Sequence, residues 1–428
     1  MFNLKARPLG THDVIVCGGG VAGIGAAVSA ARNGASVVLI EKSAALGGTL
    51  TEGLMPNIMD GENKGGLIRE LFHFLNEHGM TCTRYGERVD KNGKLIPGRM
   101  IDVEGAKYFF EKVCAEAGVK VLYNSMLVGV DHTEGHVKEI LISTLCGNYT
   151  LCASMYIDAT GYGMLSELTD LTWDCGLPGE KTPNPASMSI VLGGLPHDYN
   201  GTDSPEEKTE YAKLLAKNGI HISAEQATLA KLPTLETWSA GFNFEYHVEP
   251  DDIQRLSEAI IRSRKEAFEF VEGHKKIKGY ERIYNAGSAS YFGVREGRRV
   301  KGLYRLKTED IIEGKKFEDG ICLVTTGVDV HKLNSEDTTD CRRDIRSKAY
   351  HIPYRALIPQ EADNILLAGR CISGDFYPFS SYRMMGNMMT VGEAAGYAAA
   401  ICAKKKIKPS EVEGKHVSEY MKSIGHHL

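Results

Sequence analysis

The feature of this sequence that most constrains its fold is a glycine cluster placed directly after a short apolar run. Residues 13–17 (DVIVC) have the continuous apolar pattern of a strand buried in a parallel sheet, and residues 21–33 have the alanine-rich pattern of a helix. Residues 36–40 (SVVLI) then predict a second strand. These segments make up a βαβ unit of about 30 residues, so the chain should build an α/β fold.

The glycine cluster matches the G-x-G-x-x-G pattern of dinucleotide-binding turns. Gly18 permits the tight turn, Gly20 lets a pyrophosphate approach the backbone, and Gly23 lets the helix pack closely on the strand. Val21 and Ala22 begin the helix, where free N–H groups and the helix dipole favour the negative charge of phosphate. The turn therefore predicts that the chain binds a dinucleotide.

An acidic residue just after the second strand supports the same prediction. Glu41 lies 18 residues beyond Gly23 (41 − 23 = 18), close to the spacing of about 20 found in dinucleotide folds. Its carboxylate can accept hydrogen bonds from both ribose hydroxyls and would repel a 2′-phosphate. Lys42 follows directly and is included in the predicted site.

The next residues favour FAD over a nicotinamide cofactor. Gly47, Gly48 and Thr49 resemble a flavoprotein turn in which paired glycines let the backbone pass close to the pyrophosphate and ribityl chain. A nicotinamide dehydrogenase does not need glycines at this place. No second glycine-rich βαβ unit for NAD(P)H is found in the chain, so we expect any electron donor or acceptor to be external.

Two later segments agree with FAD. Residues 156–163 (YIDATGYG) resemble the turn that follows a strand in many flavoproteins. Residues 364–370 and 381–396 resemble a segment in which a strand ends at Gly-Arg and a later helix points its N-terminus at the flavin. We expect non-covalent FAD, held by Gly18, Gly20, Val21, Ala22, Gly23, Glu41, Lys42, Gly47, Gly48, Thr49, Leu127, Ala159, Thr160, Gly161, Gly369, Arg370, Asp375, Gly386 and Asn387.

The sequence between these motifs predicts two further structural features. Four hairpin-linked strands, at 119–123, 126–131, 137–143 and 149–158, insert a β-meander into the parallel core. The proline-rich stretch that follows includes strand candidates at 187–192 and 241–247 and a charged helix at 251–272. Further helices are expected at 64–78, 103–117 and 388–403, and further strands at 321–326 and 364–368.

We therefore predict an α/β protein with a Rossmann-like FAD-binding domain of the glutathione-reductase type and an inserted β-meander. A second, α+β domain should face the substrate. The expected domains are residues 1–165, the first part of the FAD-binding domain; 166–290, the substrate domain; and 291–428, the return to the FAD-binding domain with C-terminal helices.

Taken together, the motifs resemble the FAD-dependent oxidoreductases related to fumarate reductase and succinate dehydrogenase flavoproteins, in particular a mostly uncharacterised bacterial group. The matching elements are residues 294–304 (VREGRRVKGLY), 351–359 (HIPYRALIP) and 369–396. The resemblance covers residues 12–165 and 290–403 well, and is poor across 166–290. Gly297 and Glu393 depart from the usual Ser and Gln of the group.

Five residues are candidates for chemistry beside the flavin. Arg383, just before a helix N-terminus in the flavin segment, suits a carboxylate or a developing oxyanion. Arg295 could bind an acidic substrate or pair with a neighbouring acid, and an ordinary ion pair is an alternative for Arg383 as well. Tyr382 adjoins Arg383, and His351 and Tyr354 lie in a segment expected to approach the active site, where histidine could act as a general acid. The methionines between 384 and 389 have the helical spacing of core packing.

Composition narrows the function classes. None of the ten cysteines forms a Cys-x-x-Cys pair, so no metal or iron–sulfur site is expected. The net charge of −5 gives no reason to expect nucleic-acid binding, which disfavours flavin-dependent RNA modification. The chain has no apolar segment of membrane-span length and no signal-peptide pattern, so the expected location is the cytoplasm.

These observations predict an enzyme, an FAD-dependent oxidoreductase that transfers a hydride between flavin N5 and a small organic substrate. The substrate is expected to be a carboxylate or an unsaturated compound. Two alternatives stay open: a flavin-binding electron-transfer subunit that works with a partner protein, and a flavin monooxygenase that uses external NADPH. The oligomeric state is open as well.

Overall fold

The structure is a computed structural model of the 428-residue chain. It describes residues 5–82, 99–179, 182–196, 199, 201–202, 204–234, 236–334 and 345–428.

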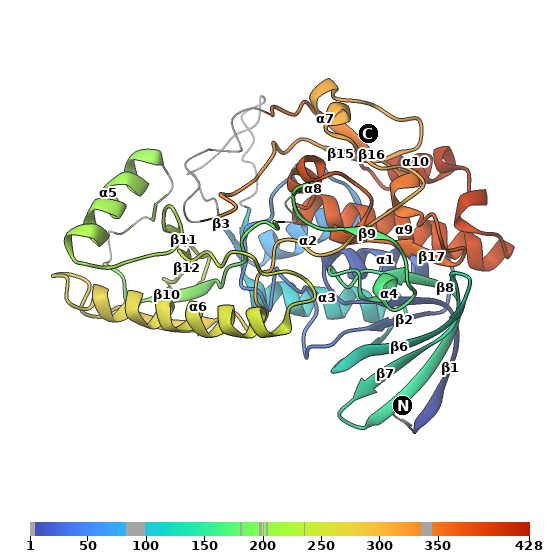
Figure 1. Cartoon of the computed structure of the whole chain (residues 1–428), viewed down its shortest axis with the longest axis horizontal. Helices are drawn as coiled ribbons and strands as arrows, with labels where there is room; N and C mark the ends of the chain where they lie inside the picture. The colour runs from blue at the N-terminus through green and yellow to red at the C-terminus, as the bar shows by residue number, and fades with distance from the viewer. Residues whose placement is uncertain are drawn as a thin grey trace.

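A seven-stranded sheet forms the centre of the molecule (Figure 1). Its strand order is β5-β2-β1-β8-β7-β6, with β17 paired to β8. The parallel members are β1 (Ala6–Cys17), β2 (Val37–Ile40), β5 (Lys120–Leu122), β8 (Gly147–Asp158) and β17 (Ile365–Leu367). Strands β6 (Ser125–Thr133) and β7 (His136–Thr144) extend the sheet beside β8 as an antiparallel meander, as predicted. The strand expected at 119–123 was wrongly placed in this meander, because it is β5 and pairs parallel with β2.

The register of the parallel strands explains where a site can form. Cys17, the last residue of β1, pairs with Ile40 at the end of β2 and with Asp158 at the end of β8. Asp158 in turn pairs with Leu367, the last residue of β17. The carboxyl ends of four strands therefore meet at one edge of the sheet, which is where open α/β sheets bind ligands.

Two helices lie against each other next to this sheet, α1 (Val21–Arg32) and α9 (Met385–Lys405). Their backbones approach so closely that a Cβ on Gly392 would lie 2.0 Å from a backbone oxygen of α1, and one on Gly396 2.1 Å from another. Gly25 on α1 is equally confined by the backbone of α9. The glycines and alanines of both helices are thus required by this close packing.

A second, four-stranded antiparallel sheet lies at the left of Figure 1, in the order β11-β12-β10-β13. Its strands are β10 (Ile190–Gly193), β11 (Thr228–Lys231), β12 (Trp238–Gly241) and β13 (Tyr284–Ser288). The long helix α6 (Ile253–His274) packs on it through a buried apolar cluster, in which the rings of Phe242 and Phe270 stack at 4.1 Å between centroids. Helix α5 (Pro205–Lys217) adds Tyr211 and Leu215 to the same cluster.

The remaining elements are short or peripheral. The helices are α2 (Gly66–Glu77), α3 (Val103–Glu116), α4 (Met164–Glu167), α7 (Thr308–Glu313), α8 (Phe376–Tyr382) and α10 (Gly414–Ser423). The 3₁₀ turns are η1 (Tyr354–Leu357), η2 (Gly369–Cys371) and η3 (Pro409–Glu411). The strand pairs are β3 (Thr81–Cys82) with β4 (Met100–Ile101), β9 (Trp173–Asp174) with β14 (Arg299–Val300), and β15 (Gly320–Val324) with β16 (Tyr350–Pro353).

Two expectations in the second domain were wrong. The strand predicted at 241–247 ends where it was expected to begin, because β12 occupies Trp238–Gly241. The aromatic and polar residues of 242–247 alternate as in a strand, yet they form only an isolated bridge, between Glu245 and Ala186. Helix α5 was missed, although Ser204 and Glu207 form a capping box at its start.

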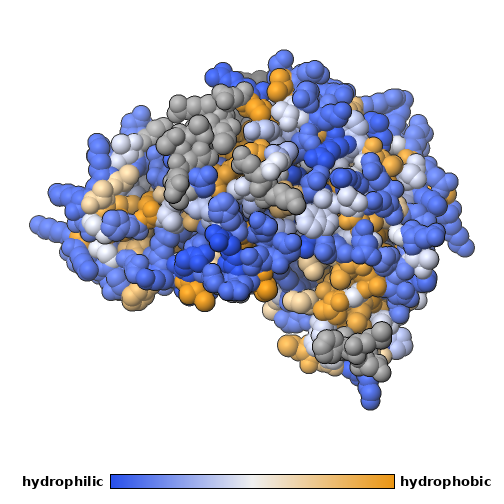
Figure 2. Space-filling model, viewed as in Figure 1, coloured by the Kyte–Doolittle hydropathy of each residue, from blue (hydrophilic) through white to orange (hydrophobic). Residues whose placement is uncertain are grey.

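The view in Figure 2 shows a mainly hydrophilic surface with apolar side chains gathered over the meander, where Met126, Val128 and Leu145 are exposed. Within the described ranges, none of the helices combines the length and the apolar composition needed to span a bilayer.

Candidate cofactor and substrate site

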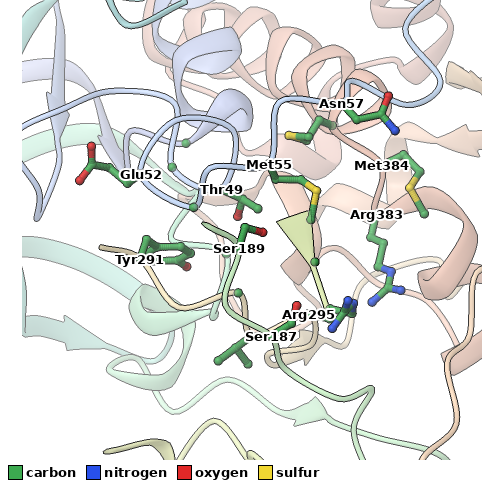
Figure 3. Close-up of a pocket in the computed structure, with 18 of the residues that line it drawn as sticks. Thr49, Glu52, Met55, Asn57, Ser187, Ser189, Tyr291, Arg295, Arg383 and Met384 are labelled. Carbon is green, nitrogen blue, oxygen red and sulfur yellow. The ribbon is translucent and has the colours of Figure 1, made fainter. Parts of the chain in front are cut away.

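A continuous cavity of about 500 Å³ lies between the carboxyl edge of the central sheet and the second sheet. One part of its wall consists of the glycine turn, the end of β2 and residues from 47–59. The other part comes from strands of the second sheet together with residues from 291–295, 329–331 and 383–388. Figure 3 shows these segments converging on one space.

The glycine turn presents bare backbone to this cavity. Gly20 is the N-cap of α1, with φ −68° and ψ 175°, and no side chain caps the helix. The first N–H groups of α1, on Val21 and Ala22, therefore have no partner within the helix. A Cβ built on Gly20 would meet no atom within 4 Å, whereas one on Gly18 or Gly23 would lie within 2.5 Å of a backbone oxygen. Gly20 thus borders open space, and the other two glycines make the turn compact.

Glu41 lies beside this turn, with its carboxylate held in place by two backbone donors. Its Oε2 accepts a hydrogen bond from Gly19 N at 2.6 Å, and its Oε1 accepts one from Ser43 N at 2.8 Å. The residue lines the cavity and is 6% exposed. Because a carboxylate can accept about four hydrogen bonds, it can still accept two from the hydroxyls of a ligand.

A second glycine turn faces the first. Gly47 N donates to Gly19 O at 2.8 Å. Gly47 and Gly48 have φ values of +108° and +56°, in the region that favours glycine. A Cβ on Gly48 would lie 3.2 Å from the Cα of Gly20, so the two turns are in close contact. This pair of turns forms a cradle of main-chain groups.

A group of cations and aromatic rings lies next to Glu41. The Nζ of Lys42 is 4.6 Å from the ring centroid of Tyr291 and 5.5 Å from that of Tyr162. Arg370 donates hydrogen bonds to the backbone oxygens of residues 294–295 at 2.5 and 3.0 Å, and its guanidinium lies 5.6 Å from the Tyr162 ring. Burial raises the pKa of Tyr162, so this phenol stays neutral. The group ties the 291–295 segment to the cradle.

Two arginines, Arg295 and Arg383, reach the opposite end of the cavity, where their guanidinium groups lie side by side (Figure 3). Arg383 Nη2 donates to Asp329, at 2.7 Å to the backbone oxygen and 3.2 Å to Oδ2. Arg295 Nη1 donates to the backbone oxygen of Pro185 at 2.5 Å, and its guanidinium lies 5.1 Å from the ring of Phe244. In the part of the chain that the structure describes, the buried Nη1 of Arg383 has no hydrogen-bond partner.

The electrostatics of this pair are unusual. Burial, together with the charge of Arg383, lowers the pKa of Arg295 to about 10, and burial also lowers the pKa of Arg383. Burial alone would raise the pKa of Asp329, but the charges of Arg383, His331 and Arg295 together outweigh it and hold that pKa below its ordinary value. Near neutral pH two guanidinium groups therefore face one carboxylate, and this end of the cavity attracts anions.

His331 completes this end of the cavity. Its ring centroid is 4.9 Å from that of Phe244, and its Nε2 is 3.7 Å from Oδ2 of Asp329. The imidazole is thus held next to the carboxylate that also contacts Arg383.

Comparison with known proteins identifies the family. A profile described as "FAD dependent oxidoreductase" matches residues 13–421 of the chain. The chain belongs to this family. A curated relative, an uncharacterized protein from the nifH2 5′ region of Methanosarcina barkeri, is 28% identical over 167 residues, covering 36% of this chain and 84% of that protein.

This FAD-dependent oxidoreductase also resembles solved structures over 96% of its length. One is the flavin-dependent brominase Bmp2, with 13% identity, a TM-score of 0.49 and 83% of that chain covered. A second is a flavoprotein/dehydrogenase from Cytophaga hutchinsonii, with 15% identity, a TM-score of 0.49 and 82% covered. A third is the p-nitrophenol 4-monooxygenase PnpA from Pseudomonas putida DLL-E4, with 12% identity, a TM-score of 0.47 and 84% covered.

The residues of the oxidoreductase fit FAD, the cofactor of its family. The open space in front of Gly20 is one that a Cβ would fill, and it lies at the unpaired N–H groups of a helix N-terminus, as a phosphate requires. Glu41 lies within the same cavity and has acceptor capacity for ribose hydroxyls. Both features belong to the part of the wall made by the two glycine turns.

Most residues predicted to hold FAD are brought together here. Those that line the cavity are Gly18, Gly20, Val21, Ala22, Glu41, Lys42, Gly47, Gly48, Thr49, Ala159, Thr160, Gly161, Gly369 and Arg370.

Five others do not line it, namely Gly23, Leu127, Asp375, Gly386 and Asn387. Leu127 is buried in the core, and Gly23 and Gly386 pack against backbone. The Asp375 carboxylate pairs with Arg305 at 2.5 Å, and Asn387 donates to Oδ2 of Asp60 at 3.0 Å. These residues support the cavity wall from behind.

Three of the five residues expected beside the reacting centre are not placed there. The hydroxyl of Tyr382 donates to the backbone oxygen of Ile372 at 3.0 Å, and that of Tyr354 donates to the backbone oxygen of Pro409 at 3.0 Å. His351 accepts a hydrogen bond from a backbone N–H at 3.3 Å. All three are buried, and none lines the cavity. Their hydrogen bonds go to main-chain groups of the scaffold, and Nε2 of His351 has no partner among the described residues.

Other lining residues were missed or misassigned. The methionines between 384 and 389 were expected in the core, and Met388 and Met389 do belong to it. Met384, Met385 and Met388 also line the cavity, together with Met55 and Asn57. A helix N-terminus that faces a cofactor exposes its first turn to that space, so helical spacing alone could not separate core from cavity. Asp329 and His331 come from a loop that carries no motif.

Proposed function

We propose that this oxidoreductase transfers two electrons between FAD and a small organic substrate that carries a carboxylate, and that Arg295 and Arg383 bind this carboxylate. The observation that carries the proposal is the pair of guanidinium groups, Arg295 and Arg383, that line the cavity; among the described residues the buried Nη1 of Arg383 has no hydrogen-bond partner. FAD, when bound, supplies the hydride-transfer chemistry. The protein has to bind and orient the substrate and to manage one proton.

The free-energy cost of burying these charged side chains is an argument that a ligand binds beside them. Arg383 is 6% exposed at its side chain, and burying an uncompensated charge costs several kcal/mol. Asp329 provides a counter-charge at Nη2 of this guanidinium, and among the described residues Nη1 has no hydrogen-bond partner. A planar carboxylate satisfies the edge of a guanidinium through two parallel hydrogen bonds, which also fix its orientation.

Each neighbour of the arginines has a role in this proposal. The carbonyl of Pro185 and the ring of Phe244 hold Arg295 in place, so it provides a second, preorganised cation. We assign to His331, held beside Asp329, the proton that accompanies hydride transfer. Lys42 and Arg370 lie in the part of the cavity that we propose for the adenosine half of FAD.

The relationship to fumarate reductase and succinate dehydrogenase flavoproteins, which the motifs suggested, belongs to this proposal. So does the division into domains at 1–165, 166–290 and 291–428. The electron-transfer subunit and the external-NADPH monooxygenase are the competing functions. The two arginines on the cavity wall favour turnover of a small acidic substrate over the electron-transfer subunit.

The test is carboxylate binding to the FAD-loaded protein. Acetate is titrated while the visible flavin spectrum or the heat of binding is followed, and the same is done with Arg383→Met and Arg295→Met. Each variant should bind acetate at least about tenfold more weakly, a loss of ~1.4 kcal/mol. Arg298→Met is the matched control, because Arg298 is equally buried but pairs with Glu167 and does not line the cavity.

An unchanged Kd in both variants would refute the role of the arginines. Turnover is then examined by mixing the oxidised protein with 2-hydroxy acids, and the reduced protein with α,β-unsaturated acids, under anaerobic conditions. Oxygen-dependent consumption of NADPH without either reaction would instead establish the monooxygenase.

A further inference from the structure

Part of the cavity runs along one face of the second sheet. Six small residues on or just before three neighbouring strands line this part, and we call it the sheet groove: Ser187, Ser189, Thr228, Ala230, Ser239 and Gly241. The pairing register places Thr228 opposite Gly241 and Ala230 opposite Ser239. The groove starts at the arginines, because Ser187 lies next to Arg295 in Figure 3.

The two faces of this sheet differ sharply in side-chain size. Successive residues of a strand point to opposite faces, so Leu229, Trp238 and Ala240 point away from the groove. These three residues belong to the buried cluster under α6. On the groove side, a Cβ on Gly241 would meet no atom within 4 Å. Among the described residues, none therefore fills the space in front of Gly241.

The six residues of the sheet groove are uncharged, whereas Lys208 and Glu225 also line the cavity, and Glu225 is paired with Lys332 at 3.5 Å. Four of the six groove residues carry hydroxyl groups, and within the described ranges no side-chain hydrogen bond engages these hydroxyls. A hydrocarbon lying over them would take them out of water without giving them a partner, which costs free energy. A chain with ether, hydroxyl or amide groups would pair with them.

A second observation, independent of the groove, also indicates that a ligand binds in this cavity. Arg383 lines the same cavity, and its buried Nη1 has no hydrogen-bond partner in the described structure. We infer that the substrate is an elongated carboxylate whose acid group binds Arg295 and Arg383 and whose uncharged polar tail lies in the sheet groove. This inference rests on the proposed function and adds the class of the substrate to it.

The experiment compares three carboxylates on the FAD-loaded protein. Acetate has no tail, methoxyethoxyethoxyacetate has a flexible ether tail, and decanoate has a hydrocarbon tail of the same length. The wild-type protein should bind the ether acid at least about tenfold more tightly than acetate, a gain of ~1.4 kcal/mol. Decanoate should bind less tightly than the ether acid.

A large side chain introduced into the groove, here called a plug, tests binding of the tail separately from binding of the acid group. In Gly241→Leu the new side chain projects into the groove, and the ether acid should lose its advantage and bind as weakly as acetate. Ala230→Leu is a second plug on the neighbouring strand. Gly287→Leu is the matched control, because Gly287 lies on β13 of the same sheet with no atom within 4 Å of its built Cβ, and does not line the cavity.

The outcomes distinguish the two proposals. Acetate affinity that is normal in both plugged variants, together with a lost preference for the ether acid, supports the sheet groove. Equal affinity for acetate and the ether acid in the wild type, a preference for decanoate, or an unaffected preference in both plugs would overturn the inference while leaving the arginines in place. Failure of every carboxylate to bind would overturn the proposed function and the inference with it.

Discussion

The substitution Gly20→Val separates binding of the cofactor from folding of the chain. Gly20 has φ −68° and ψ 175°, an extended conformation that any residue adopts, and a Cβ built on it meets nothing within 4 Å. The variant should therefore fold, with a change in the free energy of unfolding within about 1 kcal/mol, the range of N-cap substitutions.

The effect on FAD should be much larger. The valine side chain would occupy the space in front of the unpaired N–H groups of Val21 and Ala22, where the structure leaves room for phosphate. Loss of two hydrogen bonds to a charged group, worth about 1.5–3 kcal/mol each, costs about 3 kcal/mol or more. The Kd for FAD should rise at least about 100-fold.

The assay is titration of FAD into the apoprotein, followed by flavin fluorescence, with a thermal melt of each apoprotein. Gly23→Ala is the comparison, because a Cβ on Gly23 would lie 1.8 Å from the backbone oxygen of Gly18 and should lower the Tm. The reasoning is refuted by a Gly20→Val protein that purifies yellow and binds FAD with the wild-type Kd.

Two further predictions concern the scaffold. Asp60→Asn should lower the free energy of unfolding in urea by about 3 kcal/mol, because the buried ammonium of Lys64, 3.6 Å from this carboxylate, would lose its counter-charge; an unchanged urea midpoint would contradict this. His351 has its pKa lowered from 6.5 to about 4, by burial first and then by the charge of Lys316. Between these values the unfolded chain binds a proton that the folded chain does not, so stability should fall as the pH drops from 6.5 to 4, and His351→Gln should flatten that slope. Identical slopes in the two proteins would show that another group is responsible.

The part of the cavity wall made by the glycine turns could be predicted, because the residues that form it lie close together in the sequence. The strand, the turn at Gly18–Gly20 and the helix follow one another directly, and Glu41 is brought back by the next strand of the same unit. Parallel pairing alone then places Ala159, after β8, at the same edge. No knowledge of distant packing was needed.

The end of the cavity at Arg295 and Arg383 could not be predicted in the same way. Arg383 and Tyr382 are neighbours in sequence, but successive residues of a helix point about 100° apart, so only one of them reaches the cavity. The partner of Arg383 is Asp329, in a loop with no pattern of its own. Which of Tyr382 and Arg383 points into the cavity depends on how α8 packs. The residues that pack against α8 are remote from it in the sequence.

The sheet groove could not be predicted from the sequence, because the strand expected at 241–247 lies at Trp238–Gly241 instead. A strand at 241–247 places Gly241, Asn243 and Glu245 on one face and gives no role to Ser239. In the structure β12 ends at Gly241, so its small residues, Ser239 and Gly241, share a face while Trp238 and Ala240 enter the core. The alternation of large and small side chains, once placed in the correct register, is itself the sign of a ligand-facing sheet. It predicts that specificity for the tail of the substrate will be changed by substitutions on β11 and β12 that leave the binding of FAD unaltered.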